Sequence, residues 1–202
     1  MHNIRPAALA ACIIAAVLAL VATNAQANCG SSFCAINTDW NVQGVYADPG
    51  ARAELRYEYL KQDRLRSGRD KMPRGQSGEH HDELSTINQA LFATVDYNFA
   101  SGFGMSAVIP MIDREHEHIH NHLGTPIPEE WNYTRLGDIR LTGRYQFDVG
   151  RNPEHQHLFG VMLGVKLPTG ATDITNDDGD AAERSLQPGT GTTDPLIGAY
   201  YQ

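Results

Sequence analysis

The sequence predicts an all-β fold, an antiparallel β-barrel that spans the outer membrane of a Gram-negative bacterium. Three observations predict it: stretches of about ten residues alternate apolar and polar side chains, a removable leader precedes them, and the connections between them go long, short, long, short, long. Successive side chains of a strand point to opposite faces. A barrel in an outer membrane needs this division, because one face meets lipid and the other a wet lumen.

Residues 1–27 are predicted to be a signal peptide. Arg5 supplies the positive charge, residues 7–22 are apolar, and Ala25 and Ala27 form a small-x-small cleavage site. No later segment holds about 18 consecutive apolar residues, so no stop-transfer helix is expected. We therefore expect export by the Sec route and location in the outer membrane.

Residues 28–50 are predicted to form a periplasmic N-terminal segment. After cleavage two cysteines remain, Cys29 and Cys34, and an oxidising compartment favours a disulfide between them. Metal or redox use is the alternative. The ring would be small, so its stabilisation should fall below the roughly 3 kcal/mol of a loop of about 15 residues.

Residues 51–202 are predicted to hold the barrel, of which about six strands are visible. These strands are expected at 51–61, 85–99, 103–112, 137–148, 157–167 and from 194 onward. With a periplasmic N-terminus, the long connections 62–82, 113–135 and 168–193 fall outside the cell and the shorter ones fall inside, as in barrels of this class. Since single-chain barrels have about 8 strands or more, we expect an N-terminal fragment, or a piece that needs other strands.

Each stretch has its own alternation. In 51–61, Leu55, Tyr57 and Tyr59 share one face and charged residues share the other. Odd positions are apolar from 91 to 99, from 103 to 111 and from 159 to 167. In 137–148 the split is nearly complete, with Ile, Leu, Gly, Tyr and Phe facing Asp, Arg, Thr, Arg and Gln. This periodicity of two indicates strands with one apolar face.

Aromatic residues gather next to the two short connections. They are Tyr97, Phe99, Phe103, Tyr145, Phe147 and Phe159. Membrane barrels concentrate such rings at the interfaces, so these would form the inner girdle. A soluble barrel or sandwich also alternates, but its rings would fill the centre of the core, and their place at strand ends disfavours it.

The polar face of the strands carries mixed charges that could line a lumen. These residues are Glu54, Arg56, Glu58, Asp96, Arg140, Arg144 and Lys166. Mixed charges tune a pore, or pair across the barrel and only fill it; both alternatives stay open. Gly160 and Met162 make part of this face less polar, which hints at a less polar solute.

The second long connection is rich in histidine. His116, His118, His120 and His122 alternate with other residues and would project to one side of an extended chain. Imidazole suits Zn or Cu, so these side chains are candidate metal ligands, with His80 and His81 on the same side of the membrane. The alternative is a hydrated loop with a bias toward His. The acidic run 176–180 is expected to be a solvated loop rather than a Ca²⁺ site.

Catalytic motifs are absent from the sequence: there is no Gly-x-Ser-x-Gly, no His-Glu-x-x-His and no P-loop, so we expect no enzyme and no required cofactor. The formal net charge of -8 argues against a nucleic-acid partner. An acid/base site at the rim, around Asp82 and Asp113, is a minor alternative.

Three short motifs in the second half of the chain resemble those of a known family. They are LGDIRLTGRY at 136–145, GVKLPTG at 164–170 and GTGTTDP at 189–195. In this they resemble the outer-membrane family of the MetA-pathway of phenol degradation, and the likeness covers roughly residues 92–202. The resemblance implies an outer-membrane barrel of a type often described as a transporter for aromatic or other hydrophobic compounds.

We therefore expect a passive outer-membrane channel or transporter for a small solute, hydrophobic and aromatic compounds included. Its partners would be outer-membrane lipid and that solute. A metal-binding surface barrel and a structural barrel without transport are the alternatives.

Overall fold

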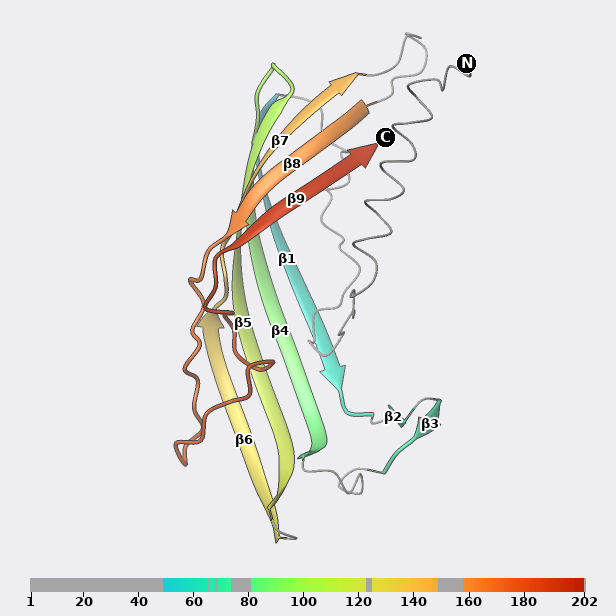
Figure 1. The fold of residues 1–202 in the computed structure, drawn as a ribbon, viewed down its shortest axis with the longest axis vertical. Helices are drawn as coiled ribbons and strands as arrows, with labels where there is room; N and C mark the ends of the chain where they lie inside the picture. Colours follow the sequence, from blue (N-terminus) through green and yellow to red (C-terminus); the bar gives the residue numbers. More distant parts are fainter. Residues whose placement is uncertain are drawn as a thin grey trace, which may run out of the picture. The chain divides into compact units, whose positions relative to one another are not determined.

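The computed structural model describes residues 49–64, 66–67, 69–73, 81–122, 125–148 and 158–201, and it is all-β and antiparallel (Figure 1). This part of the prediction is confirmed. The predicted signal peptide, the segment with Cys29 and Cys34, and His80 lie outside the described residues. Among the described residues, no helix is long and apolar enough to cross a membrane.

The main sheet follows the predicted strands in order. Its path is β1 (Gly50–Gln62), β4 (His81–Asn98), β5 (Phe103–His122), β7 (Arg140–Asp148), β8 (Leu158–Lys166) and β9 (Asp194–Tyr201). A seventh strand, β6 (Thr125–Leu136), pairs with β5, and a separate ladder joins β2 (Arg66–Ser67) to β3 (Asp70–Lys71). Over the described strands the sheet does not close, so β1 and β9 are its edges.

One strand, β5, is much longer than the apolar alternation predicts. β5 continues to His122 rather than to residue 112, while β4 begins only four residues before the predicted start at 85. In Figure 1 β6 returns beside β5, so the predicted connection 113–135 is mostly a β-hairpin. The prediction of a loop there was wrong. Polar side chains occupy both faces of this extension, His at even positions and acids at odd ones, so the apolar–polar signal of a strand is missing although the backbone continues to pair.

A β-bulge separates β6 from β7, which lie end to end along the same edge of β5. Leu136 pairs with Met111 and Arg140 pairs with Val108, so residues 137–139 stand opposite only 109–110. One extra residue reverses which positions face inward. Accordingly, the buried positions of β6 are odd, as at Trp131 and Tyr133, whereas the even positions of β7 are the less exposed ones at 142, 144 and 146.

The two faces of the sheet have reversed chemistry compared with a water-soluble protein. Exposed apolar side chains cover what we call the outer face, among them Leu55, Tyr57, Leu91, Val95, Tyr97, Met105, Leu141, Tyr145, Leu163 and Ile197. Buried polar side chains occupy the inner face, among them Asp82, Thr86, Asn88, Thr94, Asp96, Asn98, Arg114, His116 and His118. Leu163 is 64% exposed and Asp96 only 2%, the opposite of the usual preference.

The segment between β8 and β9 packs on the inner face of the β5–β6 hairpin, and we call residues 167–193 the outer loop. Trp131 Nε1 donates to the Asp180 carbonyl at 3.1 Å, and the Tyr133 hydroxyl donates to the Leu186 carbonyl. Ile174 and Leu186 of the outer loop are buried. These bonds and buried side chains hold the outer loop against the hairpin.

Arg114 joins the sheet to the outer loop, so we expect Arg114→Met to destabilise the fold. Its Nε donates to Asn88 Oδ1 at 2.6 Å and its Nη1 to the Ser185 carbonyl at 3.2 Å, and only 2% of Arg114 is exposed. Losing these bonds leaves buried acceptors unsatisfied, at a cost of about 1–3 kcal/mol in the free energy of unfolding. Denaturant unfolding followed by tryptophan fluorescence measures it.

Glu115→Met is the matched control, because the neighbouring Glu115 side chain is exposed. It should change the unfolding free energy by less than about 0.5 kcal/mol. Equal costs for the two variants would contradict the placement of Arg114.

Candidate functional site

The histidines of β5 lie on the inner face. They follow, toward the end of the strand, the stretch 103–111 whose outward side chains are apolar. His116 and His118 are 2% and 1% exposed, and the His120 side chain is 25% exposed. β5 ends at His122. The side chains of His81 and His122 lie outside the described part of the chain. The predicted common side thus holds for the three described side chains, and two of them are buried rather than hydrated.

A chain of close contacts links the buried histidines. The Thr86 hydroxyl oxygen lies 2.8 Å from His116 Nδ1, and His116 Nε2 lies 3.0 Å from His118 Nδ1. His118 Nε2 lies 2.7 Å from a carboxylate oxygen of Glu129, whose other oxygen is 3.4 Å from His120 Nδ1. The rings of His116 and His118 also lie against Trp131, with centroids 5.9 and 5.0 Å away.

These partners assign the tautomers of the neutral rings. The Glu129 carboxylate only accepts, so His118 Nε2 carries a proton and His118 Nδ1 a lone pair. His116 Nε2 therefore donates to His118, and the Thr86 hydroxyl donates to His116 Nδ1. Every ring nitrogen of the pair is satisfied in this arrangement.

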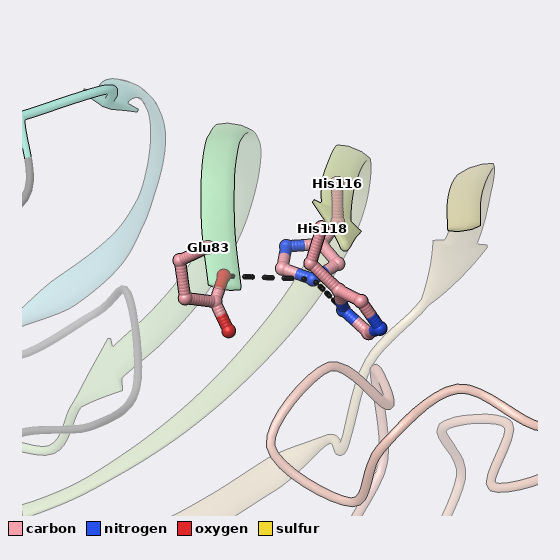
Figure 2. Close-up of side chains that lie close together, drawn as sticks. All are labelled: Glu83, His116 and His118. Carbon is pink, nitrogen blue, oxygen red and sulfur yellow. Dashed lines mark hydrogen bonds and ion pairs between the residues drawn. The ribbon is translucent and has the colours of Figure 1, made fainter. Parts of the chain in front are cut away.

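Glu83 completes the cluster from β4. One of its carboxylate oxygens is 3.6 Å from His116 Nε2, and the three residues offer ligand atoms within 4.8 Å of one another. Figure 2 shows the Glu83 side chain pointing from β4 toward the two rings on β5. Burial first, and then repulsion by His118 when that ring is protonated and by Arg114, lower the pKa of His116 to about 4. Burial raises the pKa of Glu83, which His118 opposes and Glu183 reinforces.

The residues predicted to line a lumen all lie on the inner face or at its edge. Arg144 is 3.9 Å from Asp96 and donates to Asn98, and Arg56 is 3.1 Å from Glu58. The Arg56 guanidinium also stands 4.7 Å above the Phe92 ring. Glu54 is half-buried, and Arg140 shares the inner phase of β7 but is exposed. These groups share one face of the sheet, and several of them pair with one another.

The three sequence motifs meet at Asp138, inside the bulge. Asp138 Oδ1 accepts from the Gly170 amide at 3.0 Å, and Oδ2 accepts from the Thr190 amide and hydroxyl at 2.9 and 2.8 Å. Lys166 Nζ is 3.5 Å from the same carboxylate. We call this set the Asp138 clasp, because it fixes both ends of the outer loop to the bulge.

Two glycines of the motifs have a steric role in the clasp. A Cβ on Gly170 would lie 2.6 Å from Gly189 Cα, and one on Gly189 would lie 2.3 Å from the Gly170 carbonyl oxygen. Only glycine lets the two ends of the outer loop approach so closely. The residues that suggested a family by sequence thus share one structural task.

The acidic run of the outer loop forms a turn. Asn176 Oδ1 accepts from the Asp180 amide at 2.7 Å, and Thr175 pairs with Ala181. Asp177 and Asp178 are exposed. This agrees with the expectation of a solvated acidic loop.

Glu83, Thr86, Glu129 and Trp131 escaped the sequence analysis as parts of the histidine site. Each lies in a segment whose pairing with β5 could not be read from apolar periodicity. Once the hairpin is known, register supplies the signal, because His116 stands opposite Thr86 on β4 and opposite Trp131 on β6.

No protein-family model, curated protein or solved structure matches the chain.

Asp138→Asn should release the outer loop. An amide in place of the carboxylate cannot accept on both sides and loses its attraction to Lys166, at a cost of about 1–3 kcal/mol in clasp stability. Limited trypsin digestion reports this, since Arg184 is exposed within the loop. We expect faster cleavage there than in the unmodified protein.

Asp194→Asn is the control for the clasp. Asp194 also pairs with Lys166, but its side chain is 48% exposed, so its loss should leave the cleavage rate nearly unchanged. A rate for Asp138→Asn equal to that of the control would show that the clasp does not hold the loop.

Proposed function

We propose that these strands form the wall of an outer-membrane β-barrel that conducts a small solute passively, hydrophobic and aromatic compounds included. The observation that carries the proposal is that the apolar side chains of the sheet are exposed on one face and the polar ones are buried on the other. A sheet with exposed apolar side chains and buried, mutually bonded polar ones suits a wall between lipid and a polar interior. In water it would expose a large apolar patch, which soluble monomers rarely do.

The apolar part of the outer face has the height of a bilayer core. On β5 it runs from Phe103 to Met111, about the 9–11 residues with which a tilted strand crosses a membrane. The next outer positions are Asp113, Glu115 and Glu117. The apolar row therefore ends abruptly, and the histidine extension lies beyond it.

Where the apolar part of the outer face ends, near residue 113 of β5, hydrogen bonds link side chains of four strands. The Tyr57 hydroxyl of β1 donates to Gln89 of β4 at 2.7 Å, Gln89 donates to Asp113 of β5 at 3.1 Å, and Thr134 of β6 also donates to Asp113. Polar groups at one level on an otherwise apolar face suit the boundary between hydrocarbon and headgroups.

Aromatic rings lie at the other end of the apolar part of the outer face. Tyr97 and Phe99 meet edge to face with centroids 4.7 Å apart, and Phe147 lies 5.5 Å from Phe159. Tyr97 and Phe147, near the ends of their strands, are 47% and 41% exposed. This is the arrangement of an aromatic girdle.

The inner face combines charge with apolar surface, which bears on the solute. Tyr200 stands over Gly160, and its hydroxyl donates to Gln146 Oε1 at 3.0 Å. Phe92 lies beside the Arg56 guanidinium. Flat rings among paired charges would suit a small solute with an apolar or aromatic part. The likeness to the phenol-degradation family points the same way.

The proposal requires partners for the free edges of β1 and β9. Unpaired backbone groups in hydrocarbon cost several kcal/mol each. Further strands must therefore pair with both edges when the sheet enters a membrane.

Leu163→Arg should oppose insertion, because Leu163 belongs to the apolar outer face and is 64% exposed. Arginine facing lipid near the middle of a barrel costs about 2–4 kcal/mol. The fraction folded into phosphatidylcholine vesicles, read from heat-modifiable gel mobility, should fall. Met162→Arg, at the adjacent inner position, is the control and should fold nearly normally. Equal losses would count against a lipid-facing row.

Conductance tests the passage of solutes. The full-length protein, folded in planar bilayers, should give discrete current steps. Arg140→Glu should shift ion selectivity toward cations, because Arg140 is exposed on the inner face and lumen substitutions tune selectivity. Arg66→Glu, in the separate β2–β3 ladder, should not. Silent bilayers from a verified folded barrel would favour the structural alternative.

A further inference from the structure

We propose that Glu83, His116 and His118 bind one divalent transition-metal ion, with Zn²⁺ the best match. The site would take one carboxylate oxygen and two imidazole nitrogens, the ligand set that zinc accepts with water in a fourth position. It goes beyond solute passage and does not depend on it, since a barrel without conductance could still hold the ion.

The distances between the donor atoms fit a single ion. Ligands about 2.0–2.1 Å from a tetrahedral zinc are about 3.3 Å from one another. His116 Nε2 is 3.0 Å from His118 Nδ1 and 3.6 Å from the Glu83 carboxylate (Figure 2). All three donor atoms lie within 4.8 Å of one another, so side-chain rotation that brings Glu83 closer to His118 would make them three ligands of one ion.

The groups behind the histidines are those that metal-bound imidazoles use. A ligating His normally donates its other ring N–H to a carboxylate, carbonyl or similar acceptor, which fixes its orientation. Glu129 takes this position 2.7 Å from His118 Nε2, and the Thr86 hydroxyl oxygen takes it 2.8 Å from His116 Nδ1. Both rings are thus held from behind by the sheet itself.

Loading needs one proton to move within the site. In the ion-free arrangement His116 carries its proton on Nε2 and donates to His118. For Nε2 to bind a cation, that proton must leave and Nδ1 must take one up, so the neutral ring changes tautomer without net proton loss. The Thr86 hydroxyl then rotates from donor to acceptor, as its two-way chemistry allows.

The proposed ligand set differs from the four alternating histidines that the sequence suggests. His120 is turned to the Glu129 carboxylate at 3.4 Å and stays outside the three-residue group. Glu83 replaces it from the neighbouring strand. The hairpin register selects these three donors, since Glu83 pairs with His118 across β4 and β5.

Zinc binding by the full chain, folded in detergent and purified with a histidine-free tag, tests the site. A chromophoric chelator competes for Zn²⁺, and Co²⁺ absorption reports the geometry. We expect one ion per chain. Glu83→Gln and His118→Ala should each weaken Zn²⁺ binding by about 100-fold, and Glu129→Gln by about 10-fold, since outer partners contribute roughly 10–100-fold.

His120→Ala is the matched control, because it removes a histidine of the same row that lies outside the group. It should change Zn²⁺ affinity less than about 3-fold, well under the roughly 10-fold effect of an outer partner. Heat-modifiable mobility reports whether each variant is folded, and His118→Gln replaces His118→Ala if the latter fails this check. Absence of Zn²⁺ binding, or equal losses for His120→Ala and His118→Ala, would overturn the proposal. Conductance measured on the same samples separates this outcome from failure of the channel.

Discussion

The described sheet depends on the mutual satisfaction of its inward polar side chains. Arg114, Asn88, Asp96 and His116 are almost wholly buried, and charges and amides can stay there only because they bond to one another. Many of the large apolar side chains lie instead on the outer face. The same condition that fills the inner face with hydrogen bonds thus makes the outer face suitable for lipid.

The outer loop owes its position to a small number of polar anchors. Asp138 holds both of its ends, while Trp131, Tyr133 and Arg114 bond to carbonyls in its middle. The loop in turn lies over the hairpin that carries the histidines. His116 itself is enclosed by neighbours on adjacent strands, among them Thr86 and Trp131, and burial is the main cause of its low pKa.

The sequence allowed the fold to be predicted where one face is apolar, and not where both faces are polar. The six strands of the main path were found because Leu, Val and aromatic residues alternate with polar ones, and the inner phase of Arg144 and Asp96 followed. The extension of β5 past residue 112 was missed because His and Glu alternate there, with no apolar row to mark a strand. For the same reason the histidines were expected on a common side, but Glu83 and Glu129, which come from neighbouring strands, were not. Membrane insertion, transport and family membership stay predictions.

The bulge at residues 137–139 divides one long antiparallel ribbon into two segments with independent phase. The inward positions are odd in β6 and even in β7. Because side chains of a strand alternate with a period of two, a change of two residues in each arm of the β5–β6 hairpin would keep the parity of its inward positions. The ribbon stays paired along β5 although the alternation changes parity between β6 and β7.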